Sequence, residues 1–265
     1  MLFPETKRVV FQKNPLAEVI CQLQFPSILQ IASEDPVSFQ NKIRAVYPLY
    51  ERESGGLPIM EPLPKELSTI IREFQLMGHK ESPVHKFTTA DSARFISLSP
   101  NFLAVTDRDY RRWEQFSTEV MSARAAFEEI YQPAFFTRVG LRYRDIIDKT
   151  KLGLNNEPWE TLINGSLISL LGAMEIGKRV HQISTTALLK IDEVDGGFLS
   201  LRHGLVRRSD DEAAYRIDAD FYTEERRNGK DVPTTLNIFN QLAGNLFRWA
   251  ATSRLQEALE PVAID

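Results

Sequence analysis

Hydrophobic and polar residues alternate most regularly near the middle of the chain, between Phe135 and Ile147. One side of this segment is apolar and is formed by Phe135, Val139, Leu141, Tyr143 and Ile147. The other side carries three arginines, Arg138, Arg142 and Arg144, and such a period of two is typical of a half-buried β-strand. The pattern predicts a strand over residues 134–147, which follows Pro133 and starts the second half of the chain.

The first half is expected to contain a strand, a short helix, several further strands and a long helix. Alternating residues between turn signals predict strands at 18–25, 68–77, 84–90, 94–99 and 101–106. Apolar residues at helical spacing predict helices at 36–47 and 109–131. Residues 1–14 are expected to form an irregular arm, and the glycines and prolines of residues 51–66 indicate a loop.

The second half is expected to repeat this order of elements. After the strand at 134–147 come a loop at 149–158 and a helix at 159–171. Three strands are predicted at 179–192, 198–207 and 214–223, with Asp195-Gly196-Gly197 as a hairpin turn between the first two. A last helix is predicted from a cap at Thr234 to about Leu259, where Pro261 prevents its continuation.

This order predicts an α+β fold with an internal pseudo-duplication. Each unit, residues 1–132 and residues 133–265, would contribute a strand, a helix, antiparallel strands and a long helix to one compact structure. The expected architecture is a curved antiparallel sheet with helices packed on one face. Sequence identity between the halves is slight, so the alternative that an α+β chain only looks periodic at this coarse level stays open.

The composition is that of a globular protein and narrows the classes of function. The chain has 265 residues, of which 43% are hydrophobic and 26% charged. A net charge of −4 and a pI near 5.7 argue against a dedicated nucleic-acid-binding protein. Because no apolar run approaches the roughly 20 residues of a membrane span, and because the N-terminal residues lack the order of a signal peptide, we expect a cytoplasmic protein without a membrane partner.

Motifs of common catalytic and cofactor sites are absent from the sequence. It contains no GxxxxGK[ST] loop, no GxGxxG turn between a strand and a helix, and no GxSxG elbow. His79 and His85 flank a turn and are expected to be exposed, whereas His203 is expected to be hydrogen-bonded within a strand. Cys21 is the single cysteine and lies on the apolar side of its strand, which indicates a buried, unreactive thiol. Neither a cofactor nor a metal is expected, although a catalytic triad assembled only in space stays open.

Two carboxylates form the most distinctive acidic pair. Asp218 and Asp220 would share one face of a strand, about 7 Å apart. Such a pair can hold Mg²⁺ for phosphotransfer, but that chemistry also needs a third carboxylate and a phosphate-binding loop. The favoured alternative is that the aspartates pair with arginines of a neighbouring strand, among Arg138, Arg142 and Arg202.

The three arginines of the central strand are the best candidate binding surface in the sequence. Gly140 lies between Arg138 and Arg142 on the same side and would allow a ligand backbone or ring to approach closely. Such a row can grip phosphates or an acidic protein surface. The alternative is a solvated face that is balanced by acidic neighbours such as Asp218 and Asp220.

Three segments carry a resemblance that spans nearly the whole chain: Asn14–Leu23, Arg138–Asp145 and Phe239–Trp249. They resemble a sporadically distributed bacterial family of hypothetical proteins of about 250 residues. The resemblance implies no assigned activity and no catalytic residues. The patchy distribution of such a family would suit defence or toxin–antitoxin loci.

The sequence thus favours a non-enzymatic binding protein with a protein partner, such as an antitoxin, adaptor or sensor. Its candidate binding residues are Arg138, Arg142, Arg144, Asp218 and Asp220. The first alternative is a nucleic-acid or nucleotide binder that uses the same sheet face. The second is a metal-dependent phosphotransfer enzyme built on Asp218 and Asp220.

Overall fold

Strands β2 (Leu16–Gln24) and β7 (Arg138–Asp148) pair at the centre of a nine-stranded sheet in the computed structural model. The structure describes residues 2–53, 83–208 and 210–263. The strand order is β3-β4-β5-β6-β2-β7-β10-β9-β8, and every neighbouring pair is antiparallel. The other strands of this sheet are β3 (Leu49–Glu53), β4 (Val84–Thr88), β5 (Arg94–Ser99), β6 (Phe102–Asp107), β8 (Thr185–Ile191), β9 (Gly197–Arg207) and β10 (Ala213–Thr223).

The sheet confirms the expected α+β class, and its connectivity repeats between the halves. In each half the first strand lies at the centre and the last strand pairs with it, β6 with β2 and β10 with β7. The remaining strands follow outward, so β3 and β8 form the two edges of an open sheet. A long helix follows the last strand of each half: α4 (Trp113–Tyr131) after β6, and α9 (Val232–Ala250) after β10. The strand at the start of the second half therefore joins two similar units in one continuous sheet.

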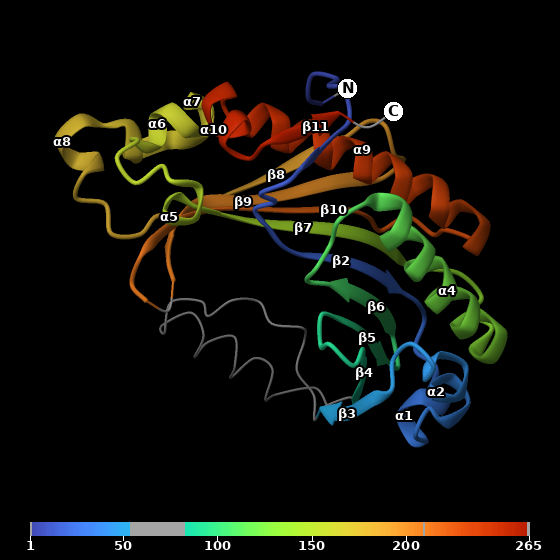
Figure 1. Ribbon diagram of the computed structural model, residues 1–265. Helices are drawn as coiled ribbons and strands as arrows, with labels where there is room; N and C mark the ends of the chain where they lie inside the picture. Colours follow the sequence, from blue (N-terminus) through green and yellow to red (C-terminus); the bar gives the residue numbers. More distant parts are fainter. Residues whose placement is uncertain (1, 54–82, 209, 264–265) are drawn as a thin grey trace, which may run out of the picture.

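Helices cover one face of the sheet, as Figure 1 shows. The long helices α4 and α9 lie beside each other on this face, and α1 (Leu29–Ser33) and α2 (Val37–Ile43) extend the layer beyond α4. Alternation along the strands directs Val139, Leu141 and their neighbours toward these helices, where they are fully buried against residues such as Phe127 and Phe239. The arginines of β7 alternate with these residues and therefore belong to the opposite face.

The two helices predicted in the second half, at 159–171 and at 234–259, are both interrupted, because residues 163 and 251 pair with each other. Ile163 and Ala251 form an antiparallel bridge, and this extended backbone interrupts both helices. The expected helix at 159–171 is instead divided into three short pieces: α6 (Trp159–Leu162), α7 (Gly165–Ile168) and the 3₁₀ turn η1 (Ser169–Gly172). Two further short helices flank this region, α5 (Lys149–Leu152) before it and α8 (Met174–Gly177) after it. The last helix is divided into α9 and α10 (Ser253–Ala258), and Thr252 caps the second piece.

Other boundaries differ because local signals compete with contacts from distant segments. Thr234 lies inside α9, which begins at Val232 after the short 3₁₀ turn η2 (Gly229–Asp231). Helix α4 begins at Trp113 rather than at Asp109. The expected arm and loop each contain an unpredicted strand: β1 (Val9–Phe11) pairs with β11 (Pro261–Ala263), and β3 overlaps the start of the loop at 51–66. The predicted strand at 68–77 lies outside the described residues.

Candidate functional site

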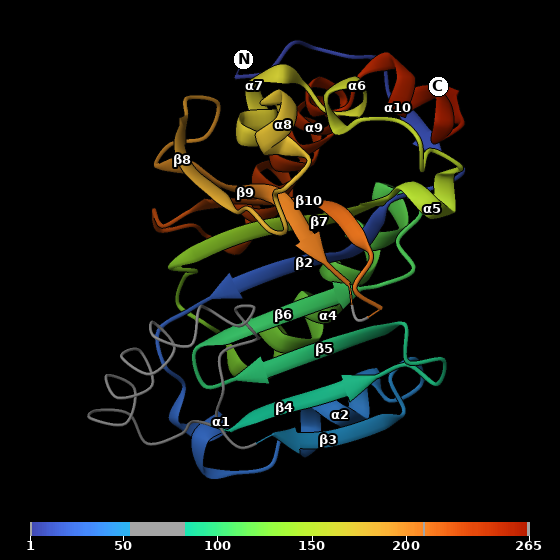
Figure 2. The same ribbon diagram turned by 90° about the vertical axis from the view of Figure 1, so that its left-hand side faces the viewer.

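The three arginines of β7 lie on the face that α4 and α9 do not cover, the face turned toward the viewer in Figure 2. Asp218 and Asp220 of β10 lie on the same face, because β10 pairs with β7 and Asp218 is directly opposite Arg144. The structure therefore brings together all five candidate binding residues of the sequence. They form what we call the charged face: Arg138, Arg142, Arg144, Asp218 and Asp220.

Each arginine of the charged face is paired with a carboxylate. Arg142 donates from Nε and Nη2 to the two carboxylate oxygens of Asp218, at 2.6 Å each. Arg138 Nη2 lies 2.9 Å from Asp220 Oδ2. Arg144 Nη2 lies 2.8 Å from Glu18 Oε1 on β2. The interpretation that the aspartates pair with arginines of a neighbouring strand is confirmed for Arg138 and Arg142.

The space above Gly140 is occupied by the side chain of Arg138 and is not open to a ligand. The Arg138 side chain runs along β7 over Gly140, where a Cβ atom would overlap its guanidinium group. In this position the guanidinium reaches Gln22 Oε1 at 2.9 Å as well as Asp220, and it lies 4.6 Å from the ring centroid of Tyr222. The expectation that Gly140 leaves room for a ligand is therefore wrong, because the Arg138 guanidinium of the same strand fills that space.

The positive charges of Arg138, Arg142 and Arg144 are each balanced by a carboxylate partner. The hydrogen bonds that Arg142 donates to Asp218 raise the pKa of Arg142 further, because they stabilise its charged form. Burial raises the pKa of Asp220, and Arg138 and Arg142 oppose that increase. The described residues contain no group of three or more metal-ligating side chains, and a cation at Asp218 would have to displace the Arg142 guanidinium. Arginines that are paired in this way attract phosphate less strongly than the row of three unpaired arginines that the sequence suggested.

Next to these pairs, the charged face carries stacked aromatic rings and an exposed leucine. The rings of Tyr222 and Phe198 stack with their centroids 5.9 Å apart, so that Arg138, Tyr222 and Phe198 form a continuous row across β7, β10 and β9. Leu188 of the edge strand β8 pairs with Ser200, which in turn pairs with Asp220, and this places Leu188 on the same face. Its side chain is 64% exposed.

On the other side of β7, a cavity of about 420 Å³ lies beneath the N-terminal arm and helix α9. Its buried floor is formed by Tyr143 and Asp145, whose side chains project from the helix-covered side of the strand. Tyr110, which precedes α4, and Trp113, the first residue of α4, form one wall, and polar residues of α9 form another: Asn237, Asn240 and Gln241. We call this space the Asp145 cavity.

Asp145 is only 8% exposed, and its carboxyl group makes no hydrogen bond or ion pair with any residue that the structure describes. Burial, together with the nearby charge of Asp218, raises the pKa of Asp145 from 3.8 to about 8. At neutral pH the group is therefore largely a neutral carboxylic acid. An unpartnered acid on the floor of a cavity is a recognised mark of functional sites.

A β-bulge in β2 lies opposite this acid. Leu16 pairs with Asp145 and Glu18 pairs with Arg144, so that Ala17 is an extra residue in β2. The bulge allows Glu18 to face Arg144 on the charged face while Leu16 lines the Asp145 cavity. The cavity was not predicted from the sequence, although the sequence contains one sign of it: Asp145 interrupts the apolar side of β7 between Tyr143 and Ile147.

A larger cavity of about 900 Å³ lies where the end of β7 meets the start of β2 and the end of β9. Its lining includes one carboxylate, Asp148, and four basic residues, Lys13, Lys151, Arg207 and Arg208. Arg208 pairs with Asp148, and Lys13 pairs with Glu260 at 2.8 Å. Lys151 makes no ion pair with a described residue, so its positive charge is free to attract an anion into this cavity.

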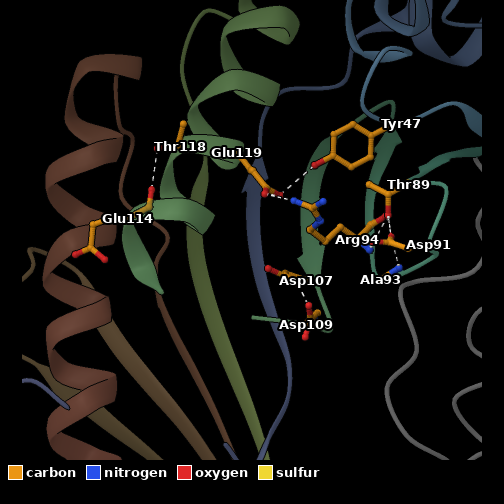
Figure 3. Close-up of polar contacts among 10 residues, drawn as sticks. All are labelled: Tyr47, Thr89, Asp91, Ala93, Arg94, Asp107, Asp109, Glu114, Thr118 and Glu119. Carbon is orange, nitrogen blue, oxygen red and sulfur yellow. Dashed lines mark hydrogen bonds and ion pairs between the residues drawn. The ribbon is translucent and has the colours of Figure 1, made fainter. Parts of the chain in front are cut away.

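A third polar cluster connects helix α4 with the first half of the sheet, as Figure 3 shows. Glu119 of α4 accepts from Arg94 of β5 and, at 3.4 Å, from the hydroxyl of Tyr47. Burial and the charge of Glu119 raise the pKa of nearby Asp107. Because Glu119 of α4 is hydrogen-bonded both to β5 and to Tyr47 in the segment that follows α2, we assign this cluster a structural role.

The remaining sequence candidates are buried within the core or against it. Cys21 is buried and free, as expected. His203 lies 2.9 Å from the hydroxyl of Tyr215 within the sheet, as expected, but the prediction that His85 is exposed is wrong: it is fully buried, with Nδ1 3.0 Å from the Tyr50 hydroxyl. His79 lies outside the described residues.

No helix among the described residues is long and apolar enough to cross a membrane. Comparison with protein-family models and with curated proteins found no match to this chain.

Proposed function

We propose that the protein is a non-enzymatic interaction protein that binds a protein partner through its charged face. The row of Arg138, Tyr222 and Phe198 beside exposed Leu188 carries the proposal. Arginine and tyrosine are enriched at the centres of protein interfaces, where a planar cation and an aromatic ring bury a large area at a low entropic cost. A cytoplasmic adaptor, sensor or antitoxin of a bacterial defence or toxin–antitoxin locus would use such a surface.

The pairing of the three β7 arginines with carboxylates favours a protein over a nucleic acid as their partner. A phosphate backbone is bound by cations whose charge is free to replace counterions. Arg138, Arg142 and Arg144 are each engaged by a carboxylate 2.6–2.9 Å away. A partner protein with both signs of charge can extend this pattern of pairs without removing any of them.

Recovery of partners from native cells, compared between two surface variants, tests the proposal. Leu188→Glu places a charge beside the aromatic row, and Val37→Glu is its matched control, because Val37 is 58% exposed but belongs to α2 on the helix-covered side. We expect tagged wild type and Val37→Glu to recover the same protein in a stoichiometric amount, and Leu188→Glu to lose at least nine-tenths of it. Equal recovery by all three, or no stoichiometric protein with wild type, would contradict the proposal.

A nucleotide or nucleic acid is the second candidate, and the basic cavity supports it. Lys151 and Arg207 line this cavity without a carboxylate partner among the described residues. Filter binding of single-stranded oligonucleotides should then weaken steeply as salt rises, and Lys151→Ala should reduce both the affinity and the salt slope. If Arg142→Ala reduced them instead, with the fold intact, the charged face would be the nucleic-acid site.

A further inference from the structure

We propose that the Asp145 cavity binds a small, planar, uncharged heterocycle whose edge carries a hydrogen-bond donor beside an acceptor, as nucleobases do. This site is separate from the partner surface of the proposed function, because the two lie on opposite faces of the sheet. Its volume of about 420 Å³ falls within the range of small-molecule sites, roughly 300–1,000 Å³.

The carboxyl group of Asp145 determines the kind of edge that it can bind. A neutral carboxylic acid donates from its hydroxyl and accepts at its carbonyl oxygen. A ligand edge with one N–H beside one acceptor can make both hydrogen bonds at once. No residue in the described part of the chain supplies these partners, so the ligand would satisfy a polar group that is otherwise buried alone.

Two asparagines of α9 provide further donors at the wall of the cavity. Asn237 Oδ1 accepts from the Trp113 indole at 2.7 Å, and Asn240 Oδ1 accepts from the Tyr143 hydroxyl at 2.8 Å. An indole N–H can only donate, which fixes the orientation of the Asn237 amide. The NH₂ groups of both amides make no hydrogen bond with a described residue, and each can donate to an acceptor on the ligand.

The aromatic walls and the charges at the mouth narrow the ligand class. The rings of Tyr110 and Tyr143 meet at 90° with centroids 6.0 Å apart, so they form a corner against which a flat ring can pack. Five basic residues line the cavity around this corner: Lys7, Arg8, Arg111, Arg112 and Arg248. Arg8 pairs with Glu114 and Arg111 with Asp109, but the other three have no carboxylate partner among the described residues. The positive potential of these three opposes an ammonium or guanidinium ligand, which would otherwise be the natural partner of a carboxylate.

Calorimetric titration with adenosine, guanosine, cytidine and uridine, each alone, tests the proposal on the full chain. We expect saturable one-site binding of at least one nucleoside. Asp145→Asn keeps a donor and an acceptor and should retain affinity within about threefold, whereas Asp145→Leu should lose at least tenfold. Asn240→Ala tests the same cavity if Asp145→Leu does not fold, and it should weaken binding by about three- to tenfold.

The pH dependence of binding tests whether the hydroxyl of protonated Asp145 binds the ligand, and this measurement on wild type needs no substitution. Since ionisation removes its donor, the affinity of wild type should be about tenfold lower at pH 9 than at pH 7. Adenosine and cytidine suit this arm, because their bases do not titrate in this range; circular dichroism checks that the protein is folded at pH 9. The binding of Asp145→Asn should not change with pH, because every other charged or titratable group near Asp145 is the same in both proteins. These groups are Asp218, which acts through the sheet, and the cavity residues Tyr110, Tyr143, Lys7, Arg8, Arg111, Arg112 and Arg248.

Three results would overturn the proposal. The first is that no nucleoside gives saturable binding to wild type. The second is equal affinity in wild type, Asp145→Leu and Asn240→Ala. The third is the same loss of affinity with pH in wild type and in Asp145→Asn. None of these outcomes bears on the partner recovered through Leu188, so the two proposals fail separately.

Discussion

Arg144 and Asp145 are consecutive residues of β7 whose side chains project from opposite faces of the sheet. Arg144 pairs with Glu18 at 2.8 Å on the charged face, while Asp145 lies on the floor of the cavity beneath α9. The charge of Asp218, which belongs to the charged face, contributes to the raised pKa of Asp145. One strand at the join between the two halves therefore supplies both candidate sites and couples them electrostatically.

The Arg142–Asp218 pair is expected to contribute strongly to the stability of the sheet. Asp218 is 5% exposed in its side chain, so removal of Arg142 leaves a buried carboxylate without its partner. Arg142→Met should lower the free energy of unfolding by about 3–5 kcal/mol, and the double variant Arg142→Met, Asp218→Asn by less than the sum of the single changes. Urea denaturation of the four proteins measures this coupling.

The exposed pair Lys42–Glu129 is the control for this experiment. Its side chains are 46% and 63% exposed, so Lys42→Met should cost no more than about 1 kcal/mol. Equal effects of Arg142→Met and Lys42→Met would show that the pair on the charged face is no stronger than a surface ion pair.

A methyl group at Gly140 should disturb Arg138 while leaving the backbone of β7 in place. In Gly140→Ala the new Cβ would overlap the Arg138 guanidinium, which must shift and thereby weaken its hydrogen bonds to Gln22 and Asp220. We expect a loss of about 1–2 kcal/mol in the free energy of unfolding. The matched control is Gly244→Ala on α9, where a Cβ meets no atom within 4 Å and helix propensity predicts a gain of about 0.5–1 kcal/mol. A gain in both variants would exclude the contact between Gly140 and Arg138.

The faces of the central strands could be predicted from the sequence because alternation is a local property. Arg138, Arg142 and Arg144 share a face for the same reason that Val139 and Leu141 share the other. The order of elements also predicted the α+β class with a large antiparallel sheet and helices. These features require only a period of two, a period of 3.6 and the positions of proline and glycine.

Features that depend on distant contacts could not be predicted in this way. The breaks near residues 163 and 251 arise because Ile163 and Ala251 pair across the fold. The Asp145 cavity is assembled from the N-terminal arm, the start of α4 and α9, which are brought together only by the folded chain. Asp145 itself was visible as a carboxylate on an apolar side, but its lack of a partner is a property of the structure.

Cys21 is expected to be chemically silent in the folded protein. Burial raises the pKa of its thiol from 9.0 to about 12, so at pH 8 the reactive thiolate is about a thousandfold rarer than for an ordinary cysteine. A disulfide exchange reagent such as DTNB should therefore titrate no thiol in native protein and one thiol per chain in guanidinium chloride. Rapid reaction under native conditions would show that β2 opens readily.

Asp145 should give the protein a stability that falls as pH rises from about 4 to about 8. Its pKa is 3.8 in the unfolded chain and about 8 in the folded protein, so the folded state binds more protons throughout this interval. Rising pH then favours unfolding, and above about 8 the effect is complete, because Asp145 is ionised in both states. The difference between the two pKa values sets an upper limit of about 6 kcal/mol.

Asp145→Asn isolates this contribution, because an amide of the same shape does not titrate. Urea denaturation at intervals from pH 5 to pH 9 should show the variant gaining stability over wild type as pH rises, with the largest gain at and above pH 8. The control Glu129→Gln removes a carboxyl group that is 63% exposed and should run parallel to wild type. If Asp145→Asn also runs parallel to wild type, Asp145 is ionised in the folded protein at neutral pH, and its cavity must hold water or a cation that relieves the buried charge.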